Sequence, residues 1–167
     1  MSQRTCNVLF VCTGNLCRSP IAEGILKKKL NEKGIQHIHA TSAGLMAPTN
    51  SPATRLAQSI SNQYGVDISQ HLSQFLSAEL VNDADIILVM ERIHQKEIEG
   101  WFHPKQKKVF LLKAFGTGGE DEEVDDPIGG NQEVFELCFQ LIESEINRIL
   151  PELLNICDSK SKGENKC

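Results

Sequence analysis

The sequence predicts an α/β protein in which helices cover both faces of a parallel sheet. Short apolar runs alternate along the chain with longer stretches that carry apolar residues at helical spacing. Strands buried on both faces have this apolar character, whereas strands with one solvated face alternate apolar and polar residues. The first apolar run ends in a tight polar loop, and sheets of this class bind ligands at the carboxyl ends of their strands.

The predicted elements begin with a strand, a tight loop and a helix. The apolar run 7–11 predicts the strand, and Gly14 and Asn15 interrupt it. The Ser19-Pro20 pair predicts the start of the helix, because proline needs no hydrogen-bond donor in a first helical turn. Later strands are expected at 38–42, 86–90 and 109–112, and later helices at 51–64, 77–84, 91–99 and 133–154.

The C-terminal part of the chain has a different character. Pro151 is expected to bend or end the last helix, because proline removes one helical hydrogen bond. The segment 158–167 is polar and has few apolar residues, so a disordered tail is expected there. A single domain is therefore predicted over residues 1–157.

Composition and charge exclude several classes of protein. Apolar residues make up 40% of the sequence and charged residues 23%, as in ordinary globular proteins. No signal-peptide pattern occurs near the N-terminus and no apolar stretch approaches the ~20 residues that span a bilayer. A cytoplasmic protein without membrane insertion is therefore expected. The net charge of −5 argues against a nucleic-acid partner, and the basic run 27–29 is interpreted as a solvated helix face.

Six cysteines raise the question of disulfides and metal sites: Cys6, Cys12, Cys17, Cys138, Cys157 and Cys167. The chain is large enough not to need disulfides for stability, and its cysteines lack zinc-site spacing. Neither a metal nor another cofactor is expected. Cys138 and Cys157 are interpreted as small buried apolar side chains.

The loop from Cys12 to Arg18 carries the strongest chemical signal. When a strand leads through a tight turn into a helix, successive backbone N–H groups point at one place and the helix dipole adds positive potential. The loop is therefore expected to bind inorganic phosphate or a similar oxyanion, with Arg18 contacting two of its oxygens. The residues expected around the anion are Thr13, Gly14, Asn15, Leu16, Cys17 and Arg18.

Cys12 is the candidate nucleophile of this loop. A helix N-terminus and a neighbouring arginine both favour the thiolate form of a cysteine. Ser19 is placed to donate a hydrogen bond to the Cys12 sulfur, and attack on a bound phosphoryl group would give a phosphocysteine intermediate. The alternative is a plain loop with a buried cysteine and a surface arginine, because this Cys/Arg spacing alone is a weak pattern.

The acidic run 120–126 supplies candidates for a proton donor, which a leaving alkoxide or phenoxide needs. Asp126 stands out, because Pro127 stiffens the chain after it and the following glycines permit a sharp loop. Asp125 is the rival candidate. The alternative is that the whole run is solvated loop charge.

The segment 11–20, VCTGNLCRSP, resembles the signature of the low-molecular-weight protein tyrosine phosphatases. The Asp126-Pro127 pair resembles the acid loop of that family, and the resemblance extends over 7–154 in order and spacing. It implies a three-layer sandwich with a four-stranded parallel sheet and the phosphate loop after the first strand. It also implies that Cys12 is the nucleophile, Arg18 the phosphate binder and Asp126 the general acid and then base.

The same resemblance implies roles for residues around the loop. Asn15 would hold the loop in shape, with Ser42 and His71 as supporting residues. Cys17 corresponds to the second loop cysteine of the family, which forms a protective disulfide with Cys12 on oxidation. Redox regulation is therefore expected.

The sequence departs from the family in positions that face the substrate. Eukaryotic members have two tyrosines after the Asp-Pro pair, where this sequence has Ile128 and Gly129. The Ile-Gly-Gly stretch is similar to the bacterial branch that includes protein arginine phosphatases, in which a threonine precedes the second loop cysteine. Leu16 stands at that position here and is apolar, as in tyrosine phosphatases. The expected substrate is a protein phosphorylated on tyrosine, with Ile128 packing on the ring, and phosphoarginine is the alternative.

Two other functions fit the sequence less well. An arsenate reductase of the similar class carries further cysteines in the middle of its sequence, and this chain has none between Cys17 and Cys138. A non-catalytic module that binds phosphoproteins would be expected to lose Cys12, Arg18 or the aspartate, and all three are present.

Overall fold

The computed structural model describes residues 4–163, which contain a four-stranded parallel sheet with strand order β2-β1-β3-β4. The strands are β1 (Cys6–Cys12), β2 (Ile38–Gly44), β3 (Ile86–Val89) and β4 (Val109–Leu111). The central strand β1 pairs with β2 on one side and β3 on the other, so that Phe10 lies opposite both Ser42 and Leu88. The carboxyl end of β1 is therefore flanked by the ends of two neighbours.

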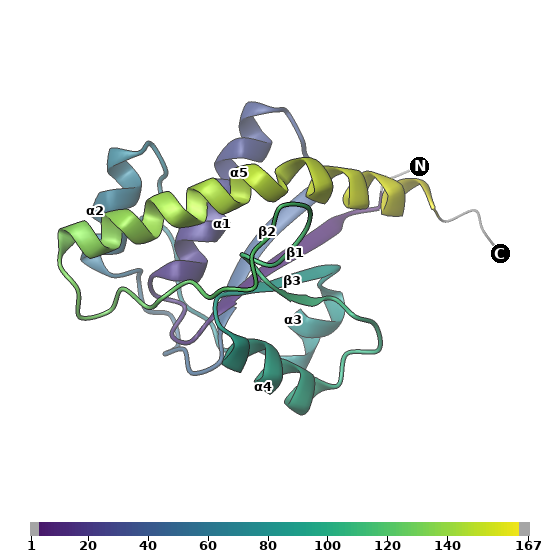
Figure 1. Cartoon of the computed structure of the whole chain (residues 1–167), viewed down its shortest axis with the longest axis horizontal. Coiled ribbons are helices and arrows are strands. Elements are labelled where there is room, and N and C mark those ends of the chain that lie inside the picture. The colour runs from purple at the N-terminus through teal and green to yellow at the C-terminus, as the bar shows by residue number, and fades with distance from the viewer. Residues whose placement is uncertain (1–3, 164–167) are drawn as a thin grey trace.

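Helices cover both faces of this sheet, which confirms the predicted three-layer sandwich (Figure 1). One face carries α1 (Arg18–Glu32), α2 (Arg55–Gln63) and α5 (Gln132–Lys162), and the other carries α3 (Ala78–Asp83) and α4 (Arg92–Phe102). Side chains of β1 alternate between two apolar clusters on these faces, as the pleat of a strand requires. Val8 and Phe10 belong to the first cluster, Leu9 and Val11 to the second.

The first helix starts as predicted and the second starts later than predicted. The first begins at Arg18, with Cys17 as its N-cap residue, so Ser19-Pro20 lies in the first turn, one of the two positions expected for this pair. The helix expected from residue 51 begins at Arg55, because the Thr54 side chain accepts a hydrogen bond from the Ala57 N–H. A threonine cap of this kind satisfies an otherwise unpaired amide at the helix start.

The last helix corrects the expectation of a disordered segment directly after residue 157. It continues through Pro151, which therefore does not end it, and reaches Lys162. Residues 158–162 are helical rather than disordered because side chains fasten them to the sheet. Asp158 contacts His37 at 2.8 Å, and Lys160 reaches the Asp85 carboxylate at 3.1 Å. The remainder of the expected tail, 164–167, lies outside the described residues.

A disulfide between Cys6 and Cys157 corrects the expectation that this chain has no disulfides. The bond joins the first residue of β1 to α5 across a sequence separation of 151 residues. Cys157 is buried, as interpreted from the sequence, but bonded. Cys12, Cys17 and Cys138 are buried free thiols. Within residues 4–163, no helix combines the length and apolar character needed to cross a membrane.

Candidate active site

The backbone between β1 and α1 forms the predicted loop, and a left-handed residue sets its turn. Asn15 has φ 55°, a conformation that asparagine tolerates better than most residues. Gly14, the residue predicted to permit the turn, has no positive φ and has room for a side chain. The position near this loop that requires a glycine is Gly44, the last residue of β2. A Cβ there would lie 2.6 Å from the Thr13 carbonyl oxygen, so Gly44 lets β2 approach the loop.

The Asn15 side chain is fully buried and ties the loop to its surroundings. Its amide nitrogen donates to the hydroxyls of Ser19 at 2.8 Å and Ser42 at 2.9 Å. Its carbonyl oxygen accepts from the Gln74 N–H at 3.0 Å, and its backbone N–H points at the Cys12 sulfur at 3.3 Å. Every polar atom of this buried amide side chain is paired, so the turn has one stable conformation.

The Cys12 sulfur lies 2.9 Å from the Ser19 hydroxyl oxygen. Because that oxygen already accepts a hydrogen bond from Asn15, its own proton is free to point at the sulfur. When Cys12 is a thiolate its sulfur can only accept, and Ser19 is then the donor of this hydrogen bond. The pairing of Cys12 with Ser19 agrees with the expectation from sequence.

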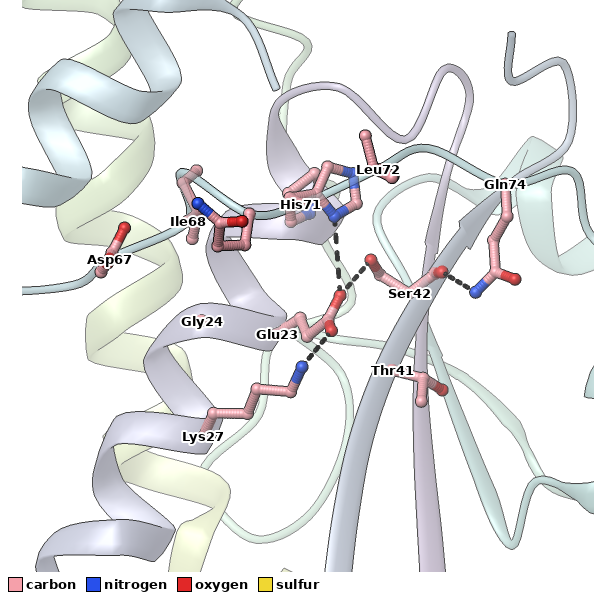
Figure 2. A pocket seen from close by; sticks show the side chains of 12 residues that line it. Glu23, Gly24, Lys27, Thr41, Ser42, Asp67, Ile68, His71, Leu72 and Gln74 are labelled. Carbon is pink, nitrogen blue, oxygen red and sulfur yellow. Dashed lines mark hydrogen bonds and ion pairs between the residues drawn. The ribbon is translucent and has the colours of Figure 1, made fainter. Parts of the chain in front are cut away.

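A polar cavity of about 260 Å³ lies beside this network (Figure 2). Figure 2 shows the Glu23 carboxylate among Ser42, His71 and Lys27. The His71 ring donates from Nε2 to the backbone carbonyl oxygen of Asn15 at 2.8 Å, so His71 contacts the backbone of the loop. Glu23 was missed from the sequence, although it lies one helical turn after Ser19 on the same face of α1.

Arg18 lies at the floor of the site and is nearly completely buried. Its Nη1 contacts the Glu91 carboxylate and donates to the Val124 carbonyl oxygen at 2.8 Å. Its Nη2 lies 3.3 Å from an oxygen of Asp126. Burial disfavours the guanidinium charge, but the negative groups Cys12, Glu91 and Asp126 outweigh burial and raise the pKa of Arg18. Arg18 therefore stays charged.

The acid loop, defined as residues 120–130, contacts Arg18 through Val124 and Asp126. Val124 is buried and its N–H donates to the Met90 carbonyl at 2.8 Å, which fixes the loop next to the sheet. Asp126 follows two residues later, accepts a hydrogen bond from the Ile128 N–H at 3.1 Å and is partly exposed. Asp125 is exposed and no contact joins it to Arg18 within residues 4–163.

Other acidic residues of the run form ion pairs at the surface of the protein. Arg92 contacts Asp121 and Glu123, and Lys113 contacts Glu122. Exposed pairs of this kind contribute little to stability. The carboxylates of the run therefore divide into a solvated group and Asp126, which is the one carboxylate within residues 120–126 that contacts Arg18.

Leu16, Cys17 and Ile128 complete the predicted set. Leu16 is half-buried against the core, and Ile128 is exposed at the acid loop. Cys17 is buried beside the Thr54 hydroxyl, and burial raises the pKa of its thiol to about 11. Sequence reasoning missed Glu91 and His94, which reach the loop from the start of α4.

Residues 7–158 match the sequence model of a family described as low molecular weight phosphotyrosine protein phosphatase. The chain belongs to this family. Its place there makes it a hydrolase and a protein phosphatase, and it favours this activity over an arsenate reductase or a non-catalytic module.

The family relatives carry two different substrate names. A probable low molecular weight protein-tyrosine-phosphatase, EpsP of Ralstonia solanacearum, is 36% identical over 146 residues, which cover 87% of this chain and 94% of the relative. A protein-arginine-phosphatase of Bacillus subtilis (strain 168) is 33% identical over 147 residues, which cover 88% and 96%. Both are bacterial, as the resemblance to the bacterial branch implied.

A solved structure agrees with the fold. The low molecular weight protein tyrosine phosphatase from T. tengcongensis superposes with a TM-score of 0.83 at 35% sequence identity. The superposition covers 89% of this chain and 99% of that structure. The phosphatase fold therefore extends over nearly the whole described chain.

Proposed function

We propose that this phosphatase hydrolyses phosphotyrosine in proteins through a phosphocysteine intermediate. Cys12 is the nucleophile, Arg18 binds the phosphoryl oxygens and Asp126 is the general acid. The observation that carries the proposal is that Cys12 and Arg18 begin and end the phosphate loop and that the carboxylate of Asp126, from the acid loop, lies beside Arg18. The Cys12 sulfur lies 2.9 Å from the Ser19 hydroxyl oxygen, and Nη2 of Arg18 lies 3.3 Å from a carboxylate oxygen of Asp126. A thiolate, a cation and a carboxyl group in one place fit transfer of a phosphoryl group.

The first chemical step transfers the phosphoryl group to the enzyme. The Cys12 thiolate attacks phosphorus, a sulfur–phosphorus bond forms and the bond from phosphorus to the phenolic oxygen breaks. Protonated Asp126 gives its proton to that oxygen, so tyrosine leaves as a neutral phenol. The loop amides and Arg18 hold the non-bridging oxygens throughout.

The second step returns the enzyme to its starting form. Asp126, now a carboxylate, accepts a proton from a water molecule as the water oxygen attacks phosphorus. The sulfur–phosphorus bond breaks, phosphate leaves and Cys12 is again a thiolate stabilised by Ser19. Protons and charges balance over the two steps with Asp126 as donor and then acceptor.

The choice of phosphotyrosine rests on Leu16 and Ile128. Leu16 supplies no hydroxyl at the phosphate loop, and the exposed Ile128 side chain offers an apolar surface for a ring. Phosphoarginine is the second candidate, because the Ile128-Gly129-Gly130 stretch resembles that of arginine phosphatases and one relative carries that name. We give Leu16 more weight because it belongs to the phosphate loop itself.

Redox regulation through Cys12 and Cys17 is part of the proposal. A peroxide oxidises the Cys12 thiolate to a sulfenic acid and is reduced to an alcohol or water. The Cys17 thiol then attacks that sulfur, a disulfide forms and water leaves.

The raised pKa of Cys17 keeps its thiol protonated, so Cys12 is the thiol oxidised first. Cys17→Ser should lose activity irreversibly in peroxide, and peptide mapping without a Cys12–Cys17 bridge would contradict the scheme.

We also propose a cytoplasmic location and phosphoproteins as partners. The buried free thiols Cys12, Cys17 and Cys138 suit a reducing compartment. The Cys6–Cys157 disulfide is compatible with it, because both cysteines are buried away from dissolved reductants. Cell fractionation tests the location, and recovery of the protein only outside the cytoplasm would contradict it.

A comparison of substrates tests the proposed activity. We expect kcat/KM on phosphotyrosine peptides to exceed that on matched phosphoserine and phosphoarginine peptides. Leu16→Thr should move the preference toward phosphoarginine, while Leu56→Thr, a substitution outside the loop, serves as a control for the added hydroxyl. If the unmodified enzyme has its highest kcat/KM on phosphoarginine, the tyrosine assignment is wrong and the second candidate stands.

A further inference from the structure

A buried histidine at the start of α4 contacts the phosphate loop. His94 is 1% exposed. Its Nε2 lies 2.9 Å from the Thr13 hydroxyl oxygen, and its Nδ1 lies 3.1 Å from the Glu91 backbone nitrogen. The ring therefore bridges the first residue of the phosphate loop after Cys12 and the residue that caps α4.

The two contacts determine where the ring carries its proton. The Glu91 N–H donates to Nδ1, so Nδ1 must present a lone pair. The single proton of the neutral ring is then on Nε2, and it is donated to the Thr13 hydroxyl oxygen. Burial, together with the nearby Arg18 charge, lowers the pKa of His94 to about 4, so the neutral form persists.

Glu91 connects this histidine to the phosphate-binding arginine. Its backbone N–H is held by His94, and its carboxylate contacts Nη1 of Arg18. A carboxylate paired with a buried guanidinium restricts the orientation of the planar group. His94 therefore lies at the start of two branches, one leading to Thr13 and one leading through Glu91 to Arg18.

The position of His94 complements the Asn15 network. Ser42 comes from β2 and α4 follows β3, and these strands lie on opposite sides of β1. Asn15 fastens the middle of the phosphate loop on the β2 side, whereas His94 fastens its first residue on the β3 side. A loop that must present convergent amides benefits from attachment at both sides, because pre-organised donors need no rearrangement when the anion binds.

We propose that His94 is a positioning residue of this phosphatase, which aligns Thr13 and, through Glu91, Arg18 for binding of the phosphoryl group. The proposal rests on the proposed function only in assigning phosphate to this loop. It predicts that loss of His94 weakens binding of inorganic phosphate as well as turnover, since both need the same alignment. It also predicts an equal loss on substrates with good and poor leaving groups, because His94 does not reach the leaving group.

Two substitutions separate the branches. In His94→Asn, the amide oxygen replaces Nδ1 as acceptor for the Glu91 N–H, but the donor to Thr13 is lost. In His94→Gln, the longer amide replaces Nε2 as donor to Thr13, but the acceptor for Glu91 is lost. Loss of one buried hydrogen bond should raise the dissociation constant of inorganic phosphate about 3- to 10-fold in each variant. His94→Leu loses both contacts, so its dissociation constant for inorganic phosphate should rise more than that of either amide variant.

Thr13 provides an independent measurement. Thr13→Val removes the hydroxyl that accepts from His94, while Thr13→Ser keeps it. We expect Thr13→Val and His94→Asn to be non-additive for phosphate affinity, because each removes the same hydrogen bond. His39→Asn, at an exposed position on β2, is the matched control and should bind phosphate as the unmodified enzyme does.

NMR titration with inorganic phosphate, below the unfolding temperature of each variant, decides the proposal. Phosphate affinity within twofold of the unmodified protein in folded His94→Asn and His94→Gln would overturn it, as would full additivity with Thr13→Val. If the histidine variants do not fold, equal phosphate affinity in Thr13→Val and Thr13→Ser would overturn it instead. The binding measurement needs no turnover, so failure of the phosphotyrosine assignment is seen separately in the substrate comparison.

Discussion

The phosphate loop and the acid loop meet at Arg18 and are held in different ways. Cys12, Asn15 and Ser19 are buried and joined by side-chain hydrogen bonds. The acid loop is largely exposed apart from Val124 and Pro127, which are buried, and Asp126 has one backbone donor and one contact with Arg18. The phosphate loop is fixed by a network of side-chain hydrogen bonds, whereas the acid loop is fixed by two buried apolar residues and one backbone hydrogen bond to Met90.

This difference assigns different tasks to the two loops. Groups that stabilise charge in a transition state are effective when their dipoles are already oriented, which burial and full hydrogen bonding achieve. A proton donor needs only to reach the leaving oxygen at the right moment. We therefore expect damage to the phosphate loop to affect every substrate, and damage to the acid loop to depend on the leaving group and on the substrate side chain.

The largest effect is expected for the nucleophile. Cys12→Ser should lower turnover by about 10⁴-fold or more, as removal of a nucleophile does in other hydrolases. Binding of inorganic phosphate should remain nearly intact, because backbone amides and Arg18 make the site. Steady-state kinetics and a phosphate titration on the same preparation check both points. Substantial turnover in the folded variant would contradict the mechanism.

The second-largest effect is expected for the general acid of the acid loop. Asp126→Asn should lower the rate on substrates with poor leaving groups by about 10²- to 10⁴-fold and cost much less with activated aryl phosphates, since a stable leaving group needs little protonation. Asp125→Asn is the matched control and should change little. A plot of rate against leaving-group pKa for both variants measures this. The reverse behaviour of the two variants would mean that Asp125 is the acid.

Loss of the hydrogen bonds made by the Asn15 side chain should lower the stability of the folded protein. Asn15→Ala leaves Ser19 and Ser42 without their donor and should lower the free energy of unfolding by about 3 kcal/mol. Asn50→Ala is a matched control, because Asn50 also has φ 55° but is exposed, so it tests the backbone conformation alone. Its cost should be about 1 kcal/mol. Equal losses for the two variants in urea unfolding would show that the network contributes nothing.

The smallest effect is expected at Ile128. An aromatic side chain there should improve contact with a tyrosine ring by about 0.5–1.5 kcal/mol. Ile128→Tyr should therefore lower KM for phosphotyrosine peptides several-fold and leave kcat unchanged, because the contact exists equally in ground and transition states. Kinetics on phosphoserine peptides provide the control, since the serine side chain is too short to reach residue 128. A change in kcat alone would speak against the assignment.

The sequence was most informative where the chemistry is local. The sheet and the phosphate loop could be predicted because alternation of apolar runs and the Cys12–Arg18 spacing are contained in short segments. The contacts of Ser42 and His71 with Asn15 followed only from the family resemblance.

Long-range partners could not be predicted in the same way. Glu91 and His94 are separated from Arg18 and Thr13 by 73 and 81 residues, and nothing in their local pattern indicates the strand order that brings them together. Gly44 could not be predicted for the same reason, because the need for a glycine there comes from the phosphate loop that packs against it. The helical conformation of residues 158–162 was not predicted, because local polarity did not reveal the contacts of Asp158 and Lys160.

The Cys6–Cys157 bond closes most of the polypeptide into a covalent ring. A single backbone cut anywhere inside this ring leaves the two pieces linked. A nick in the exposed glycine-containing turn 116–119 would put Cys12 and Arg18 on one piece and Asp126 on the other, yet both would stay joined at the far end of the molecule. Such a nicked enzyme would run as one band on a non-reducing gel and as two after reduction, and it would keep all three groups at one site.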